Sequence, residues 1–140
     1  MGRIRIIEPQ TYIHTCQLTV RVGDLNYGNH LANDKILAYV QESRILFLRS
    51  HGKSEIDFFG TSLIQGDAAV SYLSEGFLGN EISIKLGVLD VSNSSFDFVY
   101  SLYNETTQKP LALVKTRMVC FDYETRKVNP VPPSFLDLLN

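Results

Sequence analysis

Apolar and polar residues alternate with a period of two over residues 11–22. The apolar side chains stand at Cys16, Leu18, Val20 and Val22, and polar residues separate them. A period of two is typical of a strand with one face buried and the other in water. The segment is therefore predicted to be a half-buried β-strand.

The period lengthens to that of a helix between Asn33 and Ser50. A stop signal, His51-Gly52, follows directly. The apolar positions cover more than a narrow stripe, which predicts a helix enclosed on several sides. They are Ile36, Leu37, Val40, Phe47 and Leu48.

The rest of the chain has mostly the pattern of strands. Alternating runs cover residues 61–74, 81–89, 96–103 and 111–122, and their short connections indicate that they are neighbours joined as hairpins. Near the end of the chain, Ser134 is predicted to cap a short helix through Leu139. A single long helix must cover the apolar face of five antiparallel strands. We therefore predict an α+β fold in which the sheet wraps around that helix.

Length and composition indicate one domain over residues 1–140, because 44% of the 140 residues are hydrophobic and can form a core. The net charge is -2 and the basic residues are scattered, so no nucleic-acid partner is expected. No long apolar run follows residues 1–7. Neither a secretion signal nor a membrane span is predicted, and we expect a cytoplasmic protein without a membrane partner.

The two cysteines, Cys16 and Cys120, lie far apart in strand-like segments. Neither has a second cysteine at the spacing of metal ligands. Two reduced structural thiols are therefore expected, with no metal site.

The segment between the first strand and the helix, residues 22–34, is unusually polar. It contains two Asp, three Asn, one His and two Gly. Polar groups at this density cost stability unless something uses them. We interpret the segment, called the motif loop below, as an active-site loop.

The motif loop resembles that of a known family. Arg21, Asp24, His30 and Asn33 fall into the pattern Arg-x-x-Asp-x-Asp-x-x-Gly-His-x-Asn-Asn of hotdog-fold acyl-CoA thioesterases related to 4-hydroxybenzoyl-CoA thioesterase. The resemblance continues in Glu42-Ser43-Arg44, which is similar to the family's Glu-x-Arg, and in Val119-Cys120-Phe121-Asp122 with the Arg126-Lys127 and proline-rich segment after it. It covers nearly the whole chain.

The resemblance implies a hotdog fold and hydrolysis of an acyl-CoA to a free acid and CoA, without a cofactor. It also implies a homodimer or homotetramer, because in this family the pocket is built where two subunits meet. Glu42 and Arg44 are expected to form a structural pair.

One position departs from the family pattern. Asn26 stands where the family commonly has its catalytic Asp, and an amide cannot serve as a base or nucleophile at neutral pH. Asp34 is the expected replacement, because other hotdog branches place their catalytic acid on this helix. Asp24 is the second candidate. The structural alternatives are that Asp34 caps the helix and that Asp24 fixes the loop.

Thioester hydrolysis needs donors for the oxyanion as well as a base. The helix N-terminus offers free N–H groups, and Gly28 allows a close approach of the backbone. Asn26 and Asn33 could orient water or the thioester, and His30 could bind the carbonyl or hold the loop. Tyr27 is a candidate pocket wall or a packed aromatic.

The sequence does not decide which residues form the walls of the substrate site. Tyr39, Phe58, Phe59 and Tyr72 are the candidates for closing the pocket. The candidates for binding the CoA phosphates are Lys53, Lys85, Lys115 and Arg117.

Two other functions remain open. Gly23-Asp24-Leu25-Asn26 with His30 and Asp34 is similar to the motif of MaoC-like enoyl-CoA hydratases. However, Tyr27 replaces its Pro, and the spacing from Asn to His is longer by one residue. A non-catalytic module that binds acyl-CoA or an acyl carrier is favoured by Asn26.

Overall fold

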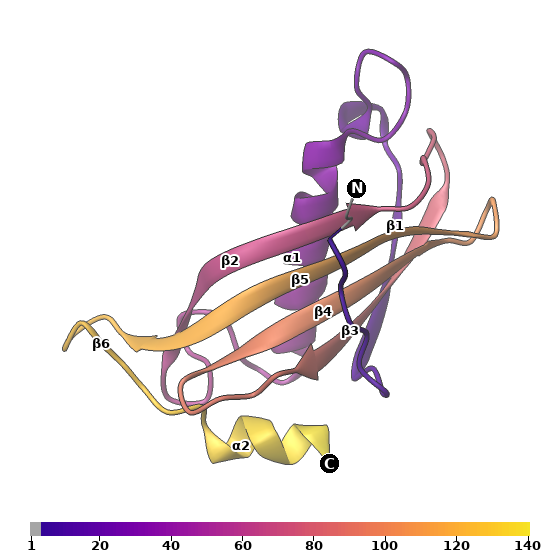
Figure 1. The fold of residues 1–140 in the computed structure, drawn as a ribbon. Coiled ribbons are helices and arrows are strands. Elements are labelled where there is room, and N and C mark those ends of the chain that lie inside the picture. Colours follow the sequence, from indigo (N-terminus) through magenta and orange to yellow (C-terminus); the bar gives the residue numbers. More distant parts are fainter. Residues whose placement is uncertain (1–3) are drawn as a thin grey trace.

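The computed structural model, which describes residues 4–140, consists of one antiparallel sheet packed against a long helix (Figure 1). Residues 1–3, part of the N-terminal segment for which no targeting signal is predicted, lie outside the described residues. The elements in chain order are β1 (His14–Thr19), the 3-10 turn η1 (Val22–Asp24), α1 (Asn33–Ser50), β2 (Ser62–Tyr72), β3 (Glu81–Leu89), β4 (Ser95–Asn104), β5 (Lys109–Asp122), β6 (Lys127–Val128), α2 (Pro133–Leu136) and η2 (Asp137–Leu139).

The sheet has six strands rather than the predicted five, because the short β6 pairs with β5. The order of the others is β1-β3-β4-β5-β2. The hairpins β3–β4 and β4–β5 are confirmed, but the predicted pairing of β2 with β3 is wrong. β2 lies at the far edge against β5, with Leu63 opposite Cys120 and Tyr72 opposite Ala112. The connection between β2 and β3, residues 73–80, therefore crosses from one side of the sheet to the other instead of forming a tight turn.

The long helix has the predicted bounds and packs on the inner face of the sheet. Ile36, Tyr39 and Val40 are each at most 4% exposed. The predicted enclosure is only partial, because Leu37 and Ile45 remain 39% and 38% exposed. The sheet curls along one side of α1 (Figure 1). Its two edges, β1 and β2, are not paired with each other, so one stripe of the helix stays uncovered.

An aromatic cluster fills the end of the core where α1 ends. Phe135 of α2 lies 4.7 Å from Phe96 and 4.8 Å from Phe58 between ring centroids. All three rings are fully buried, and each contributes about 1.5–3 kcal/mol relative to exposure. The N-cap of α2 is Pro132 and makes no side-chain cap bond, so the predicted cap by Ser134 is wrong. Burial of Phe135 holds this short helix in place.

A buried polar chain joins α1 to the sheet. Arg44 donates from Nε to Glu55 Oε1 at 2.6 Å and from a terminal nitrogen to the Tyr100 hydroxyl at 3.0 Å. Tyr100 in turn lies 2.9 Å from the Thr116 hydroxyl. The expected pairing of Arg44 with Glu42 is wrong, because residues two apart lie on different faces of a helix.

The outer face of the sheet is crossed by the segment that precedes β1. Pro9 lies so close to Gly87 of β3 that a Cβ on Gly87 would stand 2.5 Å from Pro9 Cγ. Only glycine allows this approach. The segment crosses the sheet in Figure 1.

Candidate active site

The motif loop is a closed turn whose last two residues, Asn33 and Asp34, begin α1. A backbone bridge joins Leu25 and Leu31, and the Asn26 amide donates to the His30 carbonyl at 2.9 Å. The tip carries Asn29 with φ 65°, a left-handed conformation that asparagine tolerates better than most residues. Tyr27, also at the tip, is fully exposed. The loop therefore presents its polar tip outward from a fixed base.

Asn26 organises the interior of this turn. Its side-chain oxygen accepts from the Gly28 amide at 2.8 Å and from the His30 amide at 3.4 Å. Its side-chain nitrogen lies 3.5 Å from His30 Nδ1. A Cβ on residue 28 would stand 3.3 Å from that same oxygen, which is a tight contact. Glycine at position 28 avoids it and allows the turn to close around the Asn26 side chain. Asn26 thus acts on the orientation of His30.

Asp24 is buried beneath the loop, with 4% of its surface exposed. Its Oδ2 accepts from the Tyr39 hydroxyl at 2.7 Å and from the Arg21 amide at 3.1 Å. Burial by itself would raise the pKa of Asp24, but these bonds and the nearby Arg21 guanidinium leave that pKa below its ordinary value. This geometry supports the structural alternative, in which Asp24 fixes the loop to α1.

Asp34 occupies the second position of α1 and is exposed. The N-cap residue is Ala32, which makes no side-chain cap bond, so Asp34 does not cap the helix. Within residues 4–140, no hydrogen bond or ion pair engages its carboxylate. The first N–H groups of a helix lack partners within the helix and attract negative charge, so this end of α1 suits both Asp34 and a developing oxyanion.

A cavity of about 270 Å³ lies beside the first turns of α1. Its other wall is the connection between β2 and β3, which is held against the motif loop by a 2.8 Å bond from the Leu31 amide to the Gly76 carbonyl and by a backbone bridge between His30 and Phe77. The lining residues are His30, Leu31, Asn33, Ile36, Tyr72, Leu73, Ser74, Glu75, Gly76 and Leu111.

Three of the predicted site residues meet at this cavity: His30, Asn33 and Tyr72. The Tyr72 hydroxyl donates to the Asn33 carbonyl at 3.3 Å, which ties the end of β2 to the start of α1. Among the aromatic residues considered for closing the pocket, Tyr72 is the one that lines this cavity. Asp34 belongs to the same helical turn as Asn33 but does not line it.

Sequence reasoning missed Ser74 and Glu75. Both lie on the connection between β2 and β3, whereas the sequence pattern places Ser74 at the end of a strand and Glu75 in the hairpin turn after it. A Ser-Glu-Gly stretch is ordinary in a turn, so no local signal marks these residues. Only the contact of their segment with His30 and Leu31 brings them to the site.

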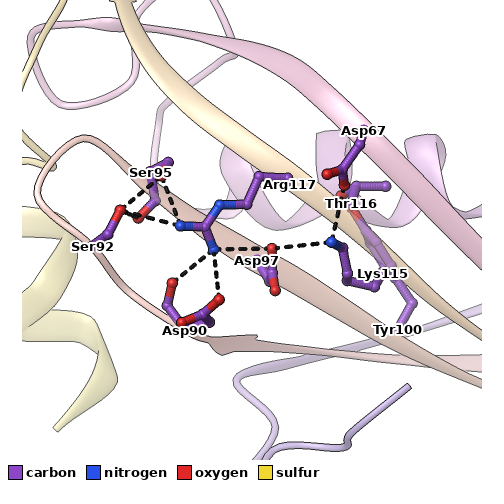
Figure 2. A network of polar contacts seen from close by, with 9 residues as sticks. All are labelled: Asp67, Asp90, Ser92, Ser95, Asp97, Tyr100, Lys115, Thr116 and Arg117. Atoms are coloured by element: carbon purple, nitrogen blue, oxygen red, sulfur yellow. Dashed lines mark hydrogen bonds and ion pairs between the residues drawn. The ribbon is translucent and has the colours of Figure 1, made fainter. Parts of the chain in front are cut away.

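Two of the basic residues considered for CoA phosphates are engaged on the outer face of the sheet (Figure 2). Arg117 donates to the Asp90 carbonyl at 2.8 Å, to Asp97 Oδ1 at 3.1 Å and to the Ser95 hydroxyl at 2.8 Å. Lys115 Nζ lies 3.0 Å from a carboxylate oxygen of Asp67. The other two, Lys53 and Lys85, lie over the rings of Phe59 and Tyr12. None of the four lines the cavity.

The described residues supply neither a metal site nor a membrane helix. No group of three or more His, Cys, Asp or Glu within residues 4–140 could hold a metal ion, and no helix there is both long and apolar enough to cross a bilayer. Cys16 and Cys120 are free thiols. Burial raises the pKa of both, that of Cys120 to about 11.

The sequence was compared with models of protein families and with curated proteins. The family model described as the thioesterase-like superfamily matches residues 20–139. No curated protein matches the sequence.

Solved structures share the fold at low sequence identity. A 1,4-dihydroxy-2-naphthoyl-CoA thioesterase from Synechocystis has a TM-score of 0.80 and 19% identity, over 89% of this chain and 93% of that chain. A predicted thioesterase from Bacillus stearothermophilus has a TM-score of 0.78 and 16% identity, over 89% and 92%. A Staphylococcus aureus protein in complex with CoA has a TM-score of 0.78 and 18% identity, over 96% and 85%.

Proposed function

The chain belongs to the thioesterase-like superfamily, and we propose that it hydrolyses the thioester bond of an acyl-CoA to a free acid and CoA. The observation that carries this proposal is the cavity beside the amino end of α1, where His30 and Asn33 meet and Asp34 stands on the same helical turn. The superfamily match supports the reaction class. The CoA complex of the structurally similar Staphylococcus aureus protein supports CoA as the carrier.

The amino end of α1 stabilises the developing negative charge in this mechanism. The thioester carbonyl oxygen binds at the N–H groups of the first helical turn, where the helix dipole is positive. His30 lines the cavity next to that turn, and Asn26 orients its ring. Removing one donor of this kind typically costs about 10²- to 10³-fold in rate.

Asp34 supplies the base. Its carboxylate takes a proton from water while the water oxygen bonds to the carbonyl carbon, giving a tetrahedral intermediate. Collapse of that intermediate breaks the carbon–sulfur bond, and CoA leaves as a thiolate that takes up the proton held by Asp34, which restores the carboxylate. The absence of a hydrogen bond or ion pair to Asp34 within the described part of the chain supports this role, because the carboxylate is free to bind water.

A second copy of the chain completes the site in this proposal. Asp34 lies on the exposed stripe of α1 together with Leu37 and Ile45, and the fully exposed Tyr27 stands at the tip of the adjacent motif loop. Exposed apolar side chains in one region are typical of an association surface. We therefore propose a homodimer, alone or paired into a tetramer, with Asp34 facing the subunit interface.

The test is a screen of the purified protein against short, medium, long and aromatic acyl-CoAs, with release of free CoA as the readout. The proposal expects release from at least one acyl class. Water addition to crotonyl-CoA is assayed in parallel, and addition without CoA release would identify a hydratase instead. Binding of acyl-CoA with neither reaction would identify a binding module.

A further inference from the structure

Glu75 gives the cavity a negative charge. It is the only acidic residue among the described residues that line the cavity, and the lining includes no Lys or Arg. Within residues 4–140 no hydrogen bond or ion pair neutralises its carboxylate. The next two residues are fixed, because the Gly76 carbonyl accepts from the Leu31 amide at 2.8 Å and Phe77 bridges to His30. These contacts fix the backbone directly after Glu75, whose side chain lines the cavity and is exposed to solvent.

The acyl group is the part of the substrate that suits this cavity. CoA carries phosphates, which a wall with a carboxylate and without cations would repel. The apolar side chains of Leu31, Ile36 and Leu111 line the same space, and its volume of about 270 Å³ suits a small acyl group. This step rests on the proposed function, in which the thioester carbonyl lies at the start of α1.

We propose that Glu75 selects the acyl group by charge: it excludes acyl chains that end in a carboxylate and admits neutral ones. Two like charges a few ångströms apart at a protein surface repel each other, and this repulsion is larger at low ionic strength, where salt screens it less. Specificity of this kind comes from a repulsive contact with the wrong substrate rather than from a better contact with the right one. The substrate class is therefore a neutral acyl-CoA, not the monothioester of a dicarboxylic acid.

The test compares two substrates of equal chain length, pentanoyl-CoA and glutaryl-CoA, which differ in a terminal carboxylate. The measured quantity is the ratio of kcat/KM for glutaryl-CoA to that for pentanoyl-CoA. We expect this ratio to rise at least about tenfold in Glu75→Gln and further in Glu75→Lys, in line with the removal and then the reversal of one charge. The matched control is Glu124→Gln, an exposed carboxylate in the turn after β5, which should leave the ratio unchanged.

An unchanged ratio in Glu75→Gln would overturn the inference, and so would an equal loss of activity with both substrates, which would indicate a catalytic role for Glu75. Calorimetric binding of the matched thioether analogues separates this inference from the proposed function, because it needs no turnover. A tenfold change in the ratio of their Kd values in Glu75→Gln would support charge selection even without hydrolysis. An unchanged Kd ratio would contradict it.

Discussion

The hydroxyl of Tyr39 donates a hydrogen bond of 2.7 Å to Asp24 Oδ2, and both residues are buried. Asp24 ends η1 near the start of the motif loop, and Tyr39 lies in the second turn of α1. The bond therefore sets the position of the loop relative to the start of the helix, where the proposed chemistry takes place. It also explains why Asp24, an acidic residue of the motif loop, is a structural rather than a reacting group in this account.

Replacing Tyr39 with Phe should destabilise the fold by about 1–3 kcal/mol, because the buried Asp24 carboxylate loses a donor. The free energy of unfolding in urea measures this change. Tyr103→Phe is the control, since that hydroxyl makes only a 3.4 Å contact with Gln108 near the surface. A Tyr39→Phe protein as stable as the wild type would contradict the assignment.

The contribution of Asp24 should also depend on pH. Its pKa is below the ordinary value in the folded protein, so its stabilisation is fully present above the unfolded pKa, about 4, and is lost as pH falls through the lower folded pKa. We expect the difference in unfolding free energy between the wild type and Asp24→Asn to shrink below about pH 4. Urea titrations over a range of pH would show whether it does.

Replacing Asn26 with Ala and replacing it with Asp should have different effects on kcat/KM. Asn26→Ala removes the acceptor for the Gly28 amide and the contact with His30, so kcat/KM should fall roughly tenfold or more as the loop loses its geometry. Asn26→Asp retains the acceptor and adds a carboxylate at the position of the second Asp in the family pattern that the motif loop resembles. In an Asp34→Asn background it should restore part of the lost kcat/KM, whereas Asn26→Ala should not. Equal activity in the two double variants would refute this interpretation.

Arg117 should matter for stability and not for the reaction. Its guanidinium holds the turn between β3 and β4 through Asp90, Ser95 and Asp97 (Figure 2). Arg117→Gln should therefore cost about 1–3 kcal/mol of unfolding free energy. The KM for an acyl-CoA should stay close to that of the wild type. A rise in KM without a loss of stability would instead support Arg117 as a ligand of the CoA phosphates.

The pattern of apolar and polar residues along the chain predicted the elements whose residues are close in sequence. The apolar spacing of Ile36, Val40 and Phe47, with the stop signal after Ser50, predicted α1. Strict alternation predicted β3 from Glu81 to Leu89. The place of β2 could not be predicted in the same way. Its pairing with β5 joins residues 40 to 59 positions apart, such as Leu63 and Cys120, and nothing in either segment encodes that pairing.

The same limit applies to the site. The motif loop could be identified because its polar residues are contiguous, but Asp24 and Asp34 look alike in sequence. They differ only because Tyr39 buries one, while the other starts the exposed stripe of α1. Glu75 could not be found, because it reaches the cavity through the crossing of residues 73–80 over the motif loop.

The most direct test of the account is the rate of CoA release by Asp34→Asn. The acyl-CoA that the wild type hydrolyses fastest is the substrate, and Asp137→Asn, an exposed carboxylate at the other end of the molecule, is the control. We expect kcat/KM to fall at least about tenfold in Asp34→Asn, as is typical for loss of a general base, with little change in thermal stability. Full activity in Asp34→Asn, or no CoA release by the wild type from any acyl-CoA, would contradict the account.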